Sequence, residues 1–198
     1  ACSQPAALDR LSVGERGRIV EVRSGHVVVL DSGLVVRLAG IEAPTLAQPH
    51  GPEAREALSR LVLNQEAQRL YGGARRDRYE RALAHLRLVK GRRWVQGEML
   101  KRGAARVRTW SDNRAMAAEM LEAEARARRK GAGLWVLTDY RVLLPGEARR
   151  KSGFQVIEGR VGKVTRSGPR AYLDFTAGGA SAQIARDDLA AFADAGKA

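Results

Sequence analysis

Residues 18–41, RIVEVRSGHVVVLDSGLVVRLAGI, decide the expected fold because they contain three runs rich in β-branched residues. Ser24-Gly25 and Ser32-Gly33 separate the runs, and both dipeptides are typical of tight hairpin turns. The stretch therefore predicts three consecutive antiparallel strands, at residues 18–23, 26–31 and 34–41.

The chain after this stretch alternates between helical and extended patterns. Residues 53–63 carry apolar side chains at helical spacing, and Pro52 suits a first helical turn. Extended runs follow at 66–71 and 82–88, and helices are predicted at 93–102 and 114–130. Five strands, with a helix between the third and fourth and more helices behind, are typical of a five-stranded Greek-key barrel. The predicted fold class is thus α+β: an OB-fold β-barrel with packed helices.

The same patterns predict the domain organisation. An N-terminal tether covers residues 1–14, the OB-fold domain 15–140, a linker 141–153 and a small β-rich C-terminal module 154–198. Within the module we expect strands at 156–164, 170–176 and 180–185 and a short helix at 186–195.

Two stretches of the chain echo each other. GRIVEV at 17–22 and GRVGKV at 159–164 are each followed by Ser-Gly and then Leu-Asp. This pattern fits either a second, incomplete barrel or two ordinary hairpins.

The net charge of +13 lies mostly in residues 51–150, which carry 23 basic and 12 acidic side chains. Such a field favours polyanions, with nucleic acid first and an anionic membrane surface second. Some of these arginines have an alternative role, because Glu and Arg alternate at helical spacing in 119–130 and would solvate a helix face. No segment approaches the roughly 20 apolar residues of a membrane span.

Cys2 is the only cysteine, which excludes an internal disulfide and a thiolate metal cluster. Ala1-Cys2-Ser3-Gln4 resembles the trimmed end of a bacterial lipoprotein signal. The expectation is export, periplasmic or membrane-anchored, with a lipid on Cys2; an ordinary N-terminal cysteine is the alternative.

Five phrases carry a family resemblance: VRLAGIEAP, QPHGPEAREAL, RDRYERALAHL, WVQGEMLKRGAARV and AEARARRKGAGLW. In this order and spacing, over about residues 15–140, the chain resembles the staphylococcal nuclease (thermonuclease) family. The resemblance implies an OB-type barrel with packed helices that cleaves DNA and RNA phosphodiesters with Ca²⁺.

That chemistry needs a hard cation held by carboxylates, a carboxylate base, and cationic donors for the phosphate. The resemblance implies that Arg37 and Arg81 are the family's two arginines. Arginine suits the role because its planar guanidinium grips two phosphate oxygens at once. Arg75, Arg76 and Arg78, in the turn before Arg81, are predicted to add to nucleic-acid binding.

The acidic positions of the family are altered. His26 stands where the resemblance implies the first metal-binding Asp, and Glu42 where it implies the second. Ala43 replaces a Thr whose carbonyl binds the metal, Thr45 replaces the Glu assigned as general base, and Glu80 replaces a Gly. Imidazole disfavours Ca²⁺, and loss of a base removes a factor of about 10²–10⁴ in rate.

We therefore expect a nuclease-like protein that binds single-stranded DNA or RNA in a basic groove, with metal-dependent hydrolysis lost or strongly reduced. One alternative is an active nuclease rebuilt on His26 and Glu42, with Glu53 as the base and a transition metal or none. Another is a protein–protein docking module.

Several side chains also have purely structural interpretations. The two arginines could pair with Glu42, Glu80 or Asp77, and His26 could cap its hairpin. His50 and His85 are predicted at the surface, and the three tryptophans are predicted to be packing anchors: Trp94, Trp110 and Trp135.

Overall fold

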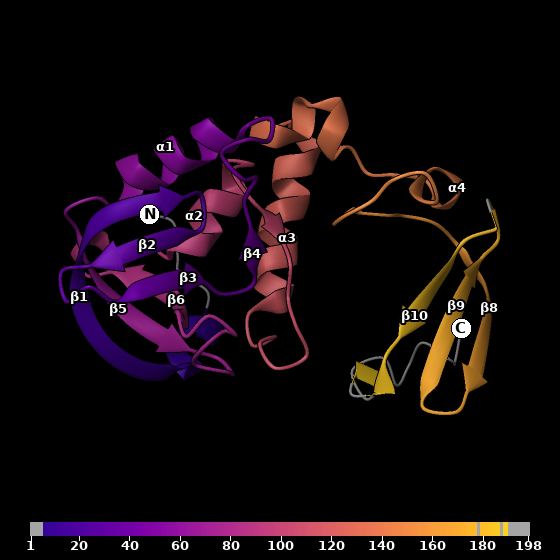
Figure 1. The fold of residues 1–198 in the computed structure, drawn as a ribbon, viewed down its shortest axis with the longest axis horizontal. Coiled ribbons are helices and arrows are strands. Elements are labelled where there is room, and N and C mark those ends of the chain that lie inside the picture. Colours follow the sequence, from indigo (N-terminus) through magenta and orange to yellow (C-terminus); the bar gives the residue numbers. More distant parts are fainter. Residues whose placement is uncertain (1–5, 178, 187, 190–198) are drawn as a thin grey trace. The chain divides into compact units, whose positions relative to one another are not determined.

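A curved first strand organises the barrel of this computed structural model, which describes residues 6–177, 179–186 and 188–189. β1 (Ser12–Ser24) pairs with β2 (Val27–Leu30) at one end and with β5 (Glu66–Tyr71) at the other. Register shifts between Ile19 and Glu21 and between Val22 and Ser24 let it bend around the barrel (Figure 1).

The barrel closes in the order β1-β2-β3-β6-β5, which confirms the predicted OB-type α+β fold. β3 (Val35–Leu38) runs antiparallel to β2 and parallel to β6 (Ala82–Leu88). A separate short pair, β4 (Ile41–Glu42) with β7 (Arg106–Val107), extends this framework beside the barrel.

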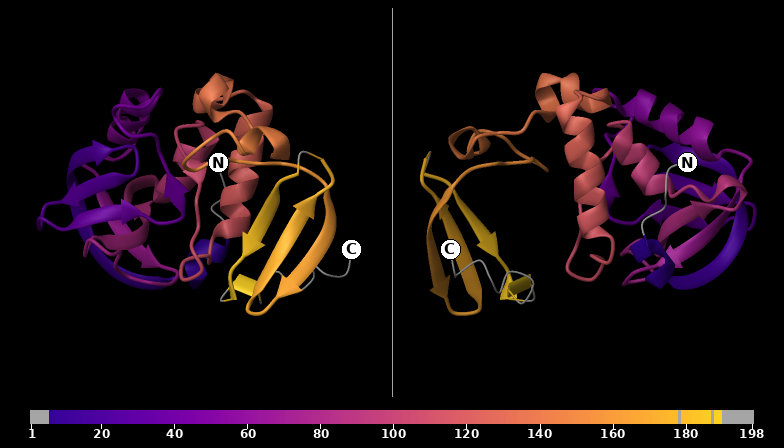
Figure 2. Two further views of the ribbon diagram at one scale, coloured as in Figure 1. Left: turned by 45° about the vertical axis from the view of Figure 1, so that its right-hand side comes forward. Right: turned by 180° about the vertical axis from the view of Figure 1, so that it is seen from behind.

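The helices lie close to their predicted positions. α1 spans Gly51–Val62, α2 spans Val95–Lys101 and α3 spans Ala117–Arg129, with α3 packed against α2 (Figure 2). α2 begins later than predicted because Trp94 is extended and bridges to Arg87. α3 also begins later, because a turn places the amide of Asn113 on the carbonyl of Trp110.

Four short 3-10 turns connect these elements: η1 Ala6–Arg10, η2 Lys90–Arg92, η3 Gly133–Val136 and η4 Thr138–Tyr140.

One continuous apolar core fills the barrel and the space under the helices, and includes Ile19, Leu38, Leu58, Met99 and Met120.

The chain divides into two compact units, residues 1–136 and 137–198. The second unit holds a short helix, α4 (Pro145–Ala148), inside the stretch predicted as a linker. Its sheet has the order β10-β9-β8, from β8 (Val161–Ser167), β9 (Arg170–Phe175) and β10 (Ser181–Ile184) (Figure 2).

The sequence echo maps onto the hairpins β1–β2 and β8–β9. Within the described residues, the first belongs to the closed barrel and the second to a three-stranded open sheet. Strand β8 begins at Val161 instead of the predicted 156, because Ile157 instead forms an isolated bridge with Leu143. Most of the helix predicted at 186–195, and Cys2 with its predicted lipid, lie outside the described residues.

Gly103 follows α2 and packs closely against the turn after α3. Its φ is +63°, and a Cβ there would lie 1.9 Å from the carbonyl oxygen of Ala132. Gly33 has a similar φ of +80° but nothing within 4 Å of the added Cβ. A substitution at Gly33 would therefore add backbone strain alone, whereas one at Gly103 would add both backbone strain and steric overlap.

Gly33→Ala should lower the free energy of unfolding by about 1–2 kcal/mol, the cost of a left-handed L-residue. Gly103→Ala should cost roughly 1–3 kcal/mol more, because the backbone must also shift. Urea unfolding of both variants measures the difference; equal losses would contradict this packing at Gly103.

Candidate functional site

A cavity of about 610 Å³ opens between the ends of β3 and β4, the loop before β6, and the segment after β7. Its lining includes five arginines, Arg37, Arg76, Arg78, Arg81 and Arg108. Three carboxylates also line it, those of Glu42, Asp77 and Asp112. We call this cavity the basic groove. Because arginines exceed carboxylates, it favours an anionic ligand.

Arg37 and Glu42 form an ion pair in the groove. Arg37 lies on β3 and Glu42 on β4, and Gly40, with a φ of +76°, allows the chain to reverse between them. Arg37 Nη2 lies 2.7 Å from Glu42 Oε2, and the two side chains are 12% and 25% exposed. The pair orients Arg37 and neutralises much of its charge in the absence of a ligand.

Arg81 is held by a tight loop built on Asp77. Asp77 Oδ1 accepts hydrogen bonds from the amides of Tyr79 and Arg81, and Oδ2 accepts one from Arg81 Nε at 2.8 Å. These donors outweigh burial and lower the pKa of Asp77, although burial alone would raise it. Asp77 therefore remains ionised and fixes the direction of the Arg81 guanidinium.

Glu80 adopts a φ of +59° in this loop, at the position where the resemblance implies glycine. A left-handed residue with a side chain costs about 1–2 kcal/mol. Two hydrogen bonds hold its backbone. The Glu80 amide donates to the carbonyl of Asp77, and the Glu80 carbonyl accepts from Arg76 Nη1. The loop thus keeps the glycine-like conformation without glycine.

His26 occupies the turn between β1 and β2 and faces the groove. Its Nδ1 accepts a hydrogen bond of 3.2 Å from the amide of Ala43, which ties the turn to the segment after β4. Burial, and then Arg37 and Arg81, lower the pKa of His26 to about 4, against the opposing effect of Glu42. The imidazole is consequently neutral at pH 7 and a weak base.

The residues of the groove do not fit a Ca²⁺ ion, which takes 6–8 oxygen ligands. Glu42 Oε2 already accepts from Arg37, and Oε1 lies 3.6 Å from Arg108 Nη1. Both carboxylate oxygens of Asp77 accept hydrogen bonds as well. Over residues 6–177, 179–186 and 188–189, no group of three or more His, Cys, Asp or Glu side chains is arranged to hold a metal.

Thr45 and Glu53 lie apart from the groove lining. Thr45 is exposed, and its amide donates to Gln48 Oε1 at 2.8 Å in the loop before α1. Glu53 is exposed in the first turn of α1. The groove therefore brings together the two family arginines, Arg37 and Arg81, with Glu42 and His26. Thr45 and Glu53, the two positions considered for the general base, are not in its lining.

Of the other predicted arginines, Arg76 and Arg78 line the groove. Arg75 is exposed and stacks on Tyr71 instead, 5.0 Å from the ring centroid.

Two exposed aromatic rings also line the groove, and neither was predicted from the sequence to lie there. Tyr79 is 62% exposed and Trp110 is 51% exposed, so the prediction that Trp110 is a packing anchor is wrong. Arg78 and Arg81 lie over the Tyr79 ring, and Arg108 lies 5.0 Å from the centre of the Trp110 ring. The polar neighbours of Trp110 in TWSDN were the available signal, because no apolar periodicity surrounds it.

The predicted surface position of His85 is also wrong. His85 is 1% exposed, and its Nδ1 accepts from Trp94 Nε1 at 3.4 Å. Burial lowers the pKa of His85 to about 4. Trp94 is a buried anchor as predicted, and Trp135 is half-buried beside Arg128, 5.9 Å from its ring centre.

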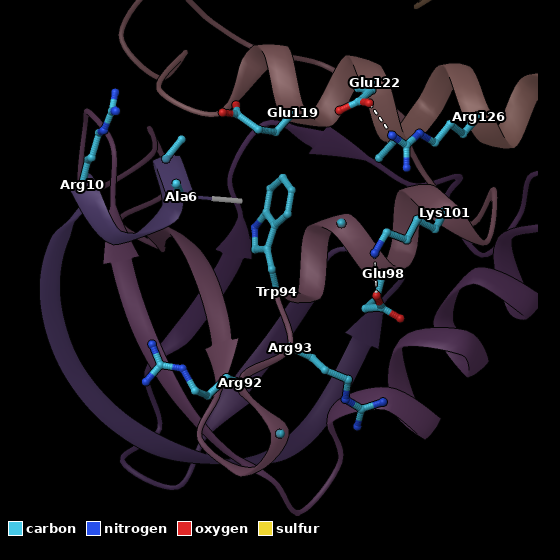
Figure 3. A pocket seen from close by; sticks show the side chains of 14 residues that line it. Ala6, Arg10, Arg92, Arg93, Trp94, Glu98, Lys101, Glu119, Glu122 and Arg126 are labelled. Carbon is cyan, nitrogen blue, oxygen red and sulfur yellow. Dashed lines mark hydrogen bonds and ion pairs between the residues drawn. The ribbon is translucent and has the colours of Figure 1, made fainter. Parts of the chain in front are cut away.

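A second cavity, of about 530 Å³, lies around Trp94 between η1, α2 and α3 (Figure 3). Two ion pairs lie in its lining, Glu98 with Lys101 at 3.1 Å and Glu122 with Arg126 (Figure 3). Five basic and three acidic side chains line it, the same balance as in the basic groove, so a count of charges does not separate the two cavities.

Comparison with known proteins agrees with this architecture. The family model described as "Staphylococcal nuclease homologue" matches residues 35–136, more than half of the chain. A probable endonuclease, lcl3, of Aspergillus flavus is 37% identical over 124 residues, which cover 53% of this chain and 44% of that protein. The thermonuclease of Staphylococcus hyicus is 25% identical over 127 residues, covering 60% of this chain and 74% of its own.

An uncharacterized endonuclease of Haemophilus influenzae is 30% identical over 139 residues, covering 68% of this chain and 72% of its own. This chain spans less than half the length of lcl3.

The fold and the groove define a nuclease-like barrel with an arginine-rich groove. The chain belongs to the staphylococcal nuclease homologue family. Membership suggests a nuclease-related function on nucleic acid. No helix within the described parts of the chain is long and apolar enough to cross a membrane.

Acid should destabilise the fold because His26 and His85 both have a pKa of about 4, lowered from 6.5. Between these values the unfolded chain binds protons that the folded chain does not, so the free energy of unfolding falls as pH drops from 7 to 5. The expected loss is about 1–2 kcal/mol per histidine. The raised pKa of Glu124 acts in the opposite direction.

His26→Gln keeps a hydrogen-bond acceptor and should remove a large part of this pH dependence. Urea titrations at both pH values test it. Identical pH profiles for the variant and the wild type would contradict the neutral, buried state of His26.

Proposed function

We propose that the basic groove binds single-stranded nucleic acid through its phosphates, and that Ca²⁺-dependent hydrolysis is lost or strongly reduced. The observation that carries the proposal is the pair of oriented arginines. Arg37 is held by Glu42 at 2.7 Å and Arg81 by Asp77 at 2.7 Å, and both guanidiniums line one cavity. Fixed guanidiniums lose little side-chain entropy when they bind a phosphate bidentately.

The exposed rings favour a single-stranded ligand. Tyr79 and Trp110 line the same groove as the arginines. Aromatic side chains stack on bases that are splayed out, which is the state of a single strand and not of a duplex. Arginines for the backbone and rings for the bases are the two elements that such binding needs.

Reduced catalysis follows from the groups around the arginines. Thr45, in place of the general base, is exposed and outside the groove lining. Glu42, the remaining carboxylate of the implied metal site, is engaged by arginine. A hydroxyl cannot act as a general base near neutral pH, and without a base the rate falls by about 10²–10⁴.

Replacing Arg37 and Arg81 together by Ala should weaken binding to a fluorescent single-stranded DNA by about 10-fold or more for each arginine. The plot of log K against log salt should become shallower, its slope decreasing in magnitude by about 1.4, because each lost phosphate contact on a single strand contributes about 0.7. Fluorescence anisotropy measures both quantities.

Arg60→Ala is the matched control, because Arg60 lies on α1 with 79% of its side chain exposed and pairs with Glu56. It should leave binding nearly unchanged. Affinity that ignores both salt and the double replacement would refute the proposal.

A second candidate, an active nuclease with a rebuilt site, is favoured by one observation: the neutral imidazole of His26 lines the groove beside Glu42. Incubating the DNA with protein in EDTA, Ca²⁺, Mn²⁺ or Zn²⁺ separates the two. We expect uncut DNA throughout. Metal-dependent cleavage that disappears with Arg37→Ala and Arg81→Ala would establish the rebuilt nuclease instead.

A further inference from the structure

Arg108 sits on the opposite side of Glu42 from Arg37. It follows β7, whose residues Val107 and Arg106 pair with Ile41 and Glu42 of β4. The amide of Arg108 donates to the carbonyl of Gly40 at 2.9 Å, so the backbone on both sides of Glu42 is fixed. This pairing brings the Arg108 side chain to Glu42 across 66 positions of sequence.

Each carboxylate oxygen of Glu42 consequently faces a guanidinium. Oε2 lies 2.7 Å from Arg37 Nη2, and Oε1 lies 3.6 Å from Arg108 Nη1. The Arg108 side chain is 33% exposed, so part of it remains open to the groove. A divalent cation at Glu42 would have to displace one of these guanidiniums and would be repelled by the other.

Trp110 holds the other side of Arg108. The guanidinium carbon lies 5.0 Å from the centre of the indole ring, within cation–π range. The exposed indole and the carboxylate thus both hold the guanidinium at the edge of the groove. An oriented, always-charged fork is suited to receive phosphate oxygens.

We propose that Arg108 supplies the positive charge beside Glu42 that a divalent cation would otherwise supply, so that the groove binds phosphodiester oxygens without metal. The inference rests on the proposed function and extends it in two ways. Arg108 becomes a third phosphate-binding arginine, and nucleic-acid binding becomes independent of divalent cations.

The test compares three proteins by anisotropy with the same single-stranded DNA, in EDTA and in millimolar Ca²⁺ at matched ionic strength. They are the wild type, Arg108→Gln, and Arg102→Ala as control. Arg102 is 45% exposed at the end of α2, where it pairs with Glu98, and it is not part of the groove lining. Glutamine keeps most of the side-chain length, and thermal unfolding checks that the fold is intact.

The wild type should bind equally in EDTA and Ca²⁺, within about twofold. Arg108→Gln should bind about 10-fold more weakly in EDTA, the effect of one charge-assisted contact. Arg102→Ala should match the wild type. Arg108→Lys, which keeps the charge and loses the fork, should recover part of the affinity.

Two outcomes overturn the inference and leave the proposed function standing. One is wild-type binding that requires Ca²⁺ and still depends on Arg37 and Arg81. The other is Arg108→Gln binding as tightly as Arg102→Ala in EDTA. Absence of wild-type binding in every buffer overturns the proposed function, and this inference with it.

Discussion

The parallel pairing of β3 with β6 closes the barrel and also assembles the groove. It places Arg37 opposite Leu83, so that Arg37 and the loop residue Arg81 emerge at the same edge of the sheet. β4 follows two residues after β3 and brings Glu42 back to Arg37. Without this one pairing, the order of strands along the chain would not bring the two arginines together in space.

The electrostatics of the groove follow from this arrangement. Glu42 lies between Arg37 and Arg108, and Asp77 is bonded to Arg81. Glu42 and Asp77 therefore contact guanidiniums, and this observation supports the proposal that the groove takes an anion and not a hard cation. Half-buried ion pairs of this kind cost desolvation energy and are weak evidence of a stabilising role, which agrees with a role in binding.

Much of the barrel could be predicted from sequence because its strands are local patterns. The Ser-Gly turns indicate the first three strands, and the polar loop 72–81 separates β5 from β6. Two bounds differ: β1 begins at Ser12, inside the predicted tether, and the predicted strand 34–41 divides into β3 and β4. Boundaries were less predictable where a tertiary contact decides them, as where Trp94 is extended and bridges to Arg87 ahead of α2.

The site residues divide in the same way, into those that a local sequence pattern indicates and those that a tertiary contact decides. Arg37, Arg81, Glu42 and His26 are predicted from the family resemblance, and all four line the groove. The pairing of Arg108 with Glu42 depends on β4–β7 register, and the burial of His85 depends on Trp94, so neither is visible in a local pattern. Trp110 is exposed although tryptophan more often packs in a core, and the polar residues around it are the local signal of that exposure.

Glu42→Gln tests the central claim most directly, namely that Glu42 holds arginines for a phosphate and does not bind a metal. Because Glu42 contacts Arg37 and Arg108, Glu42→Gln should change affinity for single-stranded DNA by the same factor in EDTA and in Ca²⁺, and the exposed control Glu80→Gln should leave affinity nearly unchanged in both. A loss of affinity seen only when Ca²⁺ is present would contradict the account and identify Glu42 as a metal ligand.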